Sequence, residues 1–164
     1  MIKKSVKKEI DRIIKEIWLN DMCKEYGNGS LLKEASLQCS LYHYLRMRLS
    51  SLLKENNLYI YPEFYFKELN FFADLAIVEM DMNDGKSNIK DKVTDVAAVI
   101  ELKFSGGASQ SVENFIKADK NKLKQYSYHL PYDCQYYFGV IYETECEWTH
   151  WFDKRSTDNW GKGV

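Results

Sequence analysis

The spacing of hydrophobic residues changes from a helical period to a period of two at about residue 58. Over the first 54 residues, apolar side chains recur every three or four positions, which predicts an amphipathic helix over 4–20 and a second over about 31–54. The sequence GNGS separates them, and its Ser30 is a typical N-cap for the second helix. The lysines at positions 3, 4, 7 and 8 are expected on a solvated face of the first helix.

From residue 58 to about 104, apolar and polar residues alternate, and β-branched and aromatic residues become frequent, whereas a helical period returns over about 110–129. This pattern predicts three successive strands, a helix with one apolar face and a fourth strand, with EWTHWF at 147–152 as a candidate fifth. A helix, three strands, a helix and a strand make an α/β fold in which helices flank a mixed central sheet. The expected bounds are 58–67, 71–80 and 95–104 for the strands, about 110–129 for the helix and 134–142 for the fourth strand.

The length of 164 residues suits one globular domain over 1–164, with residues 1–30 as an N-terminal helical extension. No stretch of about 18 apolar residues is present to span a membrane, and no apolar stretch follows the basic N-terminus as it would in a signal peptide. The four cysteines are far apart and form no CxxC pair, which is typical of reduced thiols in a cytosolic protein. We therefore expect a cytoplasmic protein with no membrane contact.

Charge is distributed unevenly along the chain, although the formal net charge is only −1. Residues 1–57 carry 11 Lys and Arg against 7 Asp and Glu, whereas residues 58–104 carry 5 against 9. An acidic centre beside a basic flank suits a metal-dependent site that acts on a polyanion. A solvated surface can show the same pattern, so the charges alone do not define a function.

The sequence AAVIELKFSGG, residues 97–107, places two charges in an otherwise apolar strand. Strand alternation puts Glu101 and Lys103 on one face, with Leu102 between them on the other face. In the preceding strand, Asp74 is the single charge within a long apolar run. The side chains expected to share the face of Asp74 are Phe72, Ala76 and Val78.

Charges in an apolar strand need partners, because burying a charge is costly unless it is paired or bound to a metal. Two adjacent strands that each offer one carboxylate to the same place form an oxygen-lined site of the kind that Mg²⁺ prefers. A lysine beside that site can hold a water molecule or a phosphate oxygen, and the combination supports phosphodiester hydrolysis. The structural alternative is a salt bridge between Glu101 and Lys103 on a half-exposed face of the sheet.

The pattern Asp74 … Glu101-Leu102-Lys103, in the order αβββαβ, resembles the PD-(D/E)XK nuclease superfamily. The resemblance covers about residues 31–142 and implies a restriction-endonuclease-like core. It implies that Asp74 and Glu101 bind Mg²⁺, with Mn²⁺ as a substitute, and that the backbone carbonyl of Leu102 is a further ligand. It also implies that Lys103 positions or activates the attacking water.

Many members of the superfamily use a further glutamate, and two residues of this chain compete for that role. Glu34 lies at the polar start of the second helix and is slightly favoured over Glu63, which lies in the first strand. The chain departs from the superfamily pattern in two places. Ala73 stands where proline often precedes the first acid, and Gln125 is followed four residues later by His129, where RecB-like nucleases carry QxxxY.

The resemblance implies a hydrolase that acts on nucleic acid, with DNA favoured over RNA, as a metal-dependent endonuclease of restriction, repair, phage or defence origin. Lys122 and Lys124, in the helix after the site, are candidates for contacts with backbone phosphates or for a solvated face. Cutting both strands of DNA calls for a homodimer or for two successive nicks. The alternative from another class is a catalytically inactive member of the same fold that binds nucleic acid or a protein.

Overall fold

The computed structural model describes residues 1–105 and 111–142, and its elements follow the predicted order. The expected fifth strand at 147–152 lies outside the described residues. The helices are α1 (Lys4–Glu16), the π-helical η1 (Ile17–Met22), α2 (Cys23–Gly27), α3 (Glu34–Arg48), α4 (Ser50–Glu55), the short η2 (Ile89–Lys92) and α5 (Ser111–His129). The strands are β1 (Leu58–Phe66), β2 (Phe71–Met80), β3 (Val93–Ser105) and β4 (Gln135–Tyr142).

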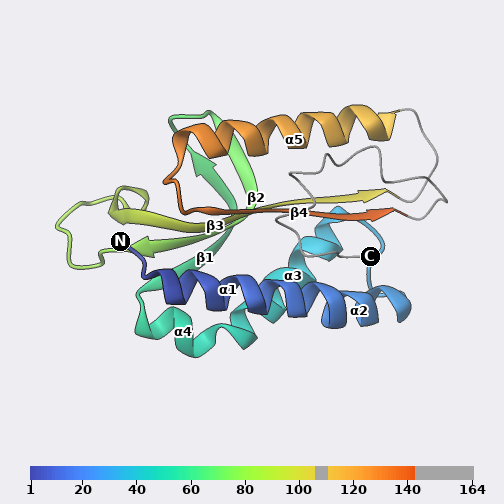
Figure 1. The fold of residues 1–164 in the computed structure, drawn as a ribbon, viewed down its shortest axis with the longest axis horizontal. Coiled ribbons are helices and arrows are strands. Elements are labelled where there is room, and N and C mark those ends of the chain that lie inside the picture. Colours follow the sequence, from blue (N-terminus) through green and yellow to red (C-terminus); the bar gives the residue numbers. More distant parts are fainter. Residues whose placement is uncertain (106–110, 143–164) are drawn as a thin grey trace.

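The four strands form one mixed sheet in the order β1-β2-β3-β4. β2 pairs antiparallel with both β1 and β3, whereas β3 and β4 run parallel and are joined through α5. Helix α5 covers one face of the sheet, and α1, α3 and α4 cover the other (Figure 1). The prediction of an α/β fold with a mixed sheet between helices is confirmed.

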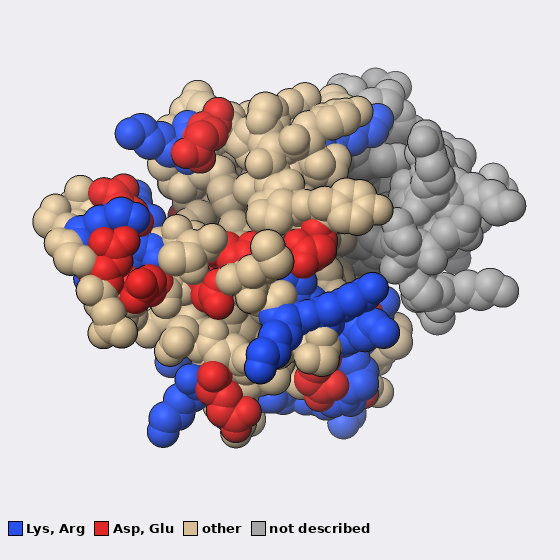
Figure 2. Space-filling view, turned by 60° about the vertical axis from the view of Figure 1, so that its left-hand side comes forward, with Lys and Arg blue, Asp and Glu red and all other residues tan. Residues whose placement is uncertain are grey.

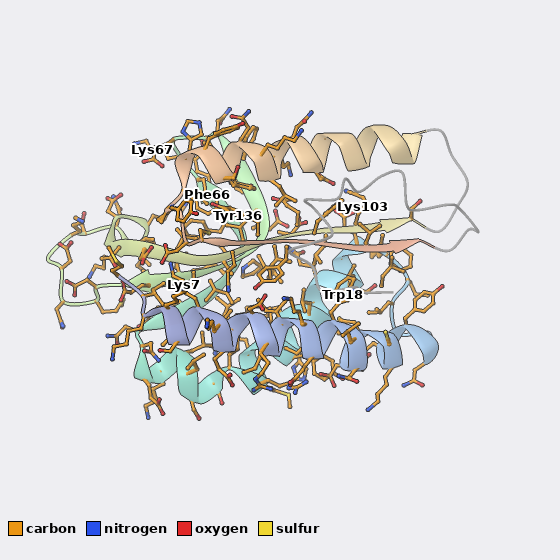
Figure 3. All side chains as sticks on the ribbon, in the orientation of Figure 1. Lys7, Trp18, Phe66, Lys67, Lys103 and Tyr136 are labelled. Atoms are coloured by element: carbon orange, nitrogen blue, oxygen red, sulfur yellow. The ribbon has the colours of Figure 1, made fainter. Side chains whose placement is uncertain are left out.

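Each face of the sheet packs into its own hydrophobic cluster. On the side of α1 and α3, Ile10 and Leu41 pack with Ile100 and Leu102 of β3. On the side of α5, Val99 of the same strand joins a second cluster with Tyr126 and Phe66, and Phe66 lies between the sheet and α5 in Figure 3. Because both faces of β3 are covered, this strand is apolar on both sides, and a charge within it is buried with it.

Strands β1 and β2 bend together at one position. In β1, Tyr61 and then Phe64 pack against the cluster on the α5 side, so the regular alternation shifts by one residue at Glu63. Glu63 has a φ of 49°, in the left-handed region that non-glycine residues rarely adopt. Beyond this point the β1–β2 hairpin curls toward α5 (Figure 1).

The matching residue of β2 is Asp74, and the bend changes which side chains share its face. Ala76 and then Ala73 belong to the cluster on the α5 side, so alternation breaks between them. The prediction that Phe72 lies on the same face as Ala76 is therefore wrong. Phe72 is 53% exposed, and its ring packs against that of Tyr65 in β1 instead, with 4.8 Å between the ring centroids.

The N-terminal helix differs from the prediction at its end and at one lysine. It is α-helical only to Glu16 and continues to Met22 as a π-helix. Lys7 is 3% exposed, so the prediction that it lies on a solvated face is wrong. Its Nζ lies 2.8 Å from Oδ1 of Asp133 and 4.0 Å from Oδ2 of Asp95, and Figure 3 shows it pointing from α1 toward the sheet. This paired charge ties α1 to β3 and to the turn before β4.

The second helix begins later than predicted. Lys33 is its N-cap, and the Oγ of Ser36 accepts a hydrogen bond of 3.1 Å from the Lys33 amide. The prediction of Ser30 as the N-cap is therefore wrong. The serine that accepts hydrogen bonds from the backbone at the start of the helix is Ser36, which lies in the first turn. The single helix expected over 31–54 is also divided at Leu49 into α3 and α4.

Trp18 of η1 packs against β3 and β4 behind the strand that carries the predicted site, and it points toward the sheet in Figure 3. A Cβ atom at Gly139 would lie 2.6 Å from ring atoms Cη2 and Cζ3 of Trp18, and 2.9 Å from Cδ2 of Leu102. Real Cβ atoms do not approach carbon atoms so closely. Only glycine at position 139 therefore allows this packing.

None of the helices in the described part of the chain combines the length and the apolar composition needed to cross a membrane. Cys23, Cys39 and Cys134 are free thiols, as predicted for cysteines without a disulfide framework. Cys146 lies outside the described residues.

Candidate active site

Three acidic residues lie side by side across three neighbouring strands. Leu75 pairs with Ile100, so the same register brings the next residues, Asp74 of β2 and Glu101 of β3, opposite each other. On the other side of β2, Glu63 of β1 lies opposite Asp74. The registered pairs on either side of it are Pro62 with Leu75 and Phe64 with Ala73. The prediction that Asp74 and Glu101 lie on adjacent strands is confirmed by the pairing of β2 with β3.

Asp74 ends the regular ladder between β2 and β3. Its Oδ2 accepts a hydrogen bond of 2.5 Å from the backbone amide of Leu102, beyond the last registered pair of the two strands. The carboxylate thus takes the place that a backbone carbonyl would have in a continued ladder. Asp74 is held at the sheet by this bond and lies directly beside the Glu101-Leu102-Lys103 segment.

Glu101 is 1% exposed and has a donor on each carboxylate oxygen. Tyr126 of α5 donates its hydroxyl to Oε1 over 3.0 Å, and the Nζ of Lys122 lies 3.2 Å from Oε2. Both donors come from α5, one helical turn apart. The pairing satisfies the buried carboxylate, as the low dielectric of the interior requires.

Lys103 reaches two different elements with one ammonium group. Its Nζ lies 2.9 Å from Oε2 of Glu34, at the start of α3, and 3.4 Å from Oδ2 of Asp119 on α5. Its side chain is 19% exposed, and Figure 3 shows it at the sheet below α5. Glu101 and Lys103 are thus each paired with other residues among the described contacts, which differs from the alternative of a salt bridge between the two.

Both candidates for the auxiliary acid lie at the site. Glu34 is paired with Lys103, and Glu63 accepts a hydrogen bond of 2.8 Å from the side-chain amide of Gln38. The same amide donates a second hydrogen bond of 2.8 Å to the backbone carbonyl of Asp74. Gln38, in the second turn of α3, thus binds both strands at their bend. The polar start of this helix, visible in the sequence, therefore corresponds to the part that faces the acids.

The two central carboxyl groups hold their protons more tightly than usual. Burial raises the pKa of Asp74 to about 6; the hydrogen bond from Leu102 opposes this change, and the charges of Glu34 and Glu63 add to it. Burial and the charge of Asp74 raise the pKa of Glu101 to about 7. Raised pKa values in two neighbouring acids are typical of a buried site in which carboxylates lie close together.

The whole cluster has more carboxylates than ammonium groups. Among the described residues, no three His, Cys, Asp or Glu side chains are arranged to hold a metal ion. Lys103 and Lys122 pair with the acids instead. The hard oxygen donors and the excess of negative charge nevertheless fit a divalent cation such as Mg²⁺ at Asp74 and Glu101. The members are the acids Glu34, Glu63, Asp74, Glu101 and Asp119 and the bases Lys103 and Lys122.

The two donors that α5 provides to Glu101 are not predicted from the sequence. Of the two lysines that the sequence suggests in this helix, Lys122 contacts the site, whereas Lys124 is exposed. The relevant pair is Lys122 and Tyr126, spaced by four residues, and not Gln125 and His129, which are both exposed. The signal in the sequence was the helical spacing that puts these two residues and Asp119 on one face.

Figure 2 shows acidic side chains gathered in the middle of one face of the molecule, with lysine and arginine side chains directly beside them. This mixture agrees with a net charge close to zero. It differs from the uniformly basic face of proteins that coat nucleic acid through phosphate contacts alone.

The chain was compared with models of known protein families, with curated proteins and with solved structures, and none of them matches it.

Proposed function

We propose that this protein is a divalent-cation-dependent nuclease of the PD-(D/E)XK kind, with DNA as its preferred substrate. The observation that supports this function best is the register of Asp74 opposite Glu101, with Lys103 two residues further along the same strand. The order of the elements around this register, αβββαβ, is the one the resemblance implies. Mg²⁺ is the proposed cofactor, with Mn²⁺ as a substitute.

Asp74 and Glu101 are the residues that would hold the cation, and the resemblance adds the backbone carbonyl of Leu102. A bound divalent cation supplies Lewis acidity toward a phosphate oxygen and lowers the pKa of water. The protein's own part is to present two carboxylates at a fixed separation. The bond from Leu102 to Asp74 and the bonds from α5 to Glu101 do this before any ligand arrives.

Lys103 is best suited to a role as a permanent positive charge. Burial lowers its pKa, but the hydrogen bond and charge of Glu34 and the charge of Asp119 outweigh burial, so the pKa lies above the usual value. An ammonium group of this kind does not accept a proton near neutral pH. We infer that it orients the attacking water and stabilises the charge that builds up on the phosphate in the transition state.

Glu34 has the stronger claim to the auxiliary role, because it fixes the position of Lys103. Glu63 affects the same site through its charge, which raises the pKa of Asp74, and through its position at the bend of β1.

With one proposed site in each protein molecule, cleavage of both DNA strands requires a homodimer or two successive nicks. Restriction, repair, phage DNA processing and defence are all compatible with this chemistry.

The test is a panel of end-labelled substrates: single-stranded DNA, duplex DNA, single-stranded RNA and duplex RNA, each with Mg²⁺, Mn²⁺ or EDTA. We expect cleavage of DNA that depends on the metal and produces new termini inside the strand. Metal-independent cleavage would contradict the proposal. Binding of the same substrates without any cleavage would favour the non-catalytic alternative.

A further inference from the structure

Lys122 places its ammonium group on the carboxylate that the proposed reaction needs for a cation. Its Nζ lies 3.2 Å from Oε2 of Glu101 and 3.7 Å from Oδ1 of Asp119. Tyr126 already occupies Oε1 of Glu101, so both oxygens of this buried carboxylate have protein donors. A divalent cation that binds Glu101 through Oε2 therefore competes with the ammonium group of Lys122, because two positive charges on the same oxygen repel each other.

The surroundings of Lys122 allow its displacement by a cation. Its side chain is 32% exposed, whereas that of Glu101 is 1% exposed, so the lysine enters the pair from the solvent side. It also has a second acid within reach, since Asp119 lies one turn earlier on α5. A lysine side chain has four rotatable carbon–carbon bonds and can move its charge by several ångströms without any backbone change.

Lys103 does not have the same freedom. Its Nζ lies 2.9 Å from Oε2 of Glu34 and 3.4 Å from Oδ2 of Asp119, against 3.2 Å and 3.7 Å for the two acid contacts of Lys122, and its side chain is 19% exposed against 32%. Displacing it would leave both acids without their common partner. Of these two site lysines, Lys122 is therefore the one that can exchange its partner.

We propose that Lys122 is an internal counter-ion of Glu101, which a divalent cation displaces, and that the released ammonium group then binds a phosphate oxygen of the substrate. The second half of this inference rests on the proposed nuclease function. Before the metal arrives, Lys122 keeps the buried charge of Glu101 paired. Afterwards, the same positive charge lies beside the site, where a polyanionic backbone needs it.

The counter-ion role predicts competition between Lys122 and the metal. A unit positive charge a few ångströms from a divalent cation opposes its binding, so removal of Lys122 should strengthen binding roughly ten-fold. The measurement is Mn²⁺ affinity by titration calorimetry and electron paramagnetic resonance at pH 8, for the wild type, Lys122→Met and Lys124→Met. Lys124→Met makes the same change in net charge from an exposed position of the same helix. We expect its Mn²⁺ affinity to stay within about two-fold of the wild type.

Thermal unfolding of the three metal-free proteins shows whether Lys122→Met folds, and a more conservative Lys122→Gln protein serves if it does not. Equal or weaker Mn²⁺ binding by the folded position-122 variant would overturn the inference. Binding that is absent from both wild type and variant would overturn it as well, together with the metal-dependent function.

The substrate half has its own readout, because a phosphate contact affects binding more than chemistry. In Mg²⁺, Lys122→Met should raise the KM for DNA several-fold more than it lowers kcat. An unchanged KM would overturn this half. If Mn²⁺ binds more tightly to Lys122→Met but no substrate is cleaved by the wild type, the counter-ion role stands and the nuclease proposal fails. If DNA is cleaved and Mn²⁺ affinity does not change, this inference alone fails.

Discussion

The carboxylate of Asp74 accepts a hydrogen bond of 2.5 Å from the backbone amide of Leu102, at the point where the pairing of β2 and β3 stops. The side chain of Asp74 thus accepts a hydrogen bond from β3 that a backbone carbonyl of β2 would accept in a regular antiparallel pair. The same bond fixes the first acid against the segment that carries Glu101 and Lys103. Strand pairing and the position of the proposed metal ligands are therefore linked through one contact.

The raised pKa values of Asp74 and Glu101, about 6 and about 7, make the metal-free protein less stable as pH rises. Because both acids hold protons more tightly in the folded state, their contribution to stability is complete below the unfolded values near 4 and is lost as pH passes through 7. Glu101→Gln keeps a neutral group at the position. We expect this variant to be more stable than the wild type at pH 8 and to lose less stability between pH 5 and 8. Urea unfolding in EDTA measures this difference, and parallel pH profiles for the two proteins would contradict the assignment.

Tyr126 stabilises the ionised form of Glu101, because its hydroxyl donates to Oε1 and lowers the pKa of that carboxyl. Tyr126→Phe should destabilise the metal-free protein by about 1–2 kcal/mol at pH 8, where Glu101 is charged, and by less at pH 5. Tyr132→Phe is the control, since Tyr132 is fully exposed. An equal loss of stability at both pH values would show that Tyr126 acts through packing and not through the carboxylate.

Gly139 is required by the contact of Trp18 with β4. Gly139→Ala forces a Cβ to within 2.6 Å of the Trp18 ring, so we expect a loss of about 1–3 kcal/mol in the free energy of unfolding. Gly85→Ala places a Cβ in open space and should change stability by less than about 0.5 kcal/mol. Because Leu102 also meets the new methyl group, cleavage by Gly139→Ala should slow as well. Equal stability of the two alanine variants in urea unfolding would contradict the packing.

The two auxiliary acids can be separated by matched substitutions. Glu34→Gln removes a charge that holds Lys103, whereas Glu63→Gln keeps an acceptor for Gln38. We expect Glu34→Gln to lower kcat for DNA cleavage at least ten-fold, and Glu63→Gln to lower it less. A larger effect of Glu63→Gln would assign the auxiliary role to that residue and contradict the assignment made from Lys103.

The order of the elements was predictable because apolar spacing reports which sides of a helix or strand are buried. The bend at Glu63 and Asp74 was not, since alternation assumes a regular strand, and this bend is why Phe72 faces solvent. Asp74, Glu101 and Lys103 stood out as charges in apolar strands. The partners of these charges depend on how α5 is rotated about its axis, which a single sequence pattern does not specify. The sequence therefore does not predict that Lys122 and Tyr126 contact Glu101.

The most direct test of the central claim is the rate at which supercoiled plasmid is nicked in Mg²⁺ or Mn²⁺. The proteins to compare are the wild type, Asp74→Ala, Lys103→Ala and the control Lys54→Ala, which changes an exposed lysine of α4. We predict nicking by the wild type and Lys54→Ala, and a loss of at least about 100-fold in Asp74→Ala and Lys103→Ala, with all four proteins folded. Absent nicking by the wild type, or nicking that both site substitutions leave unchanged, would contradict the account.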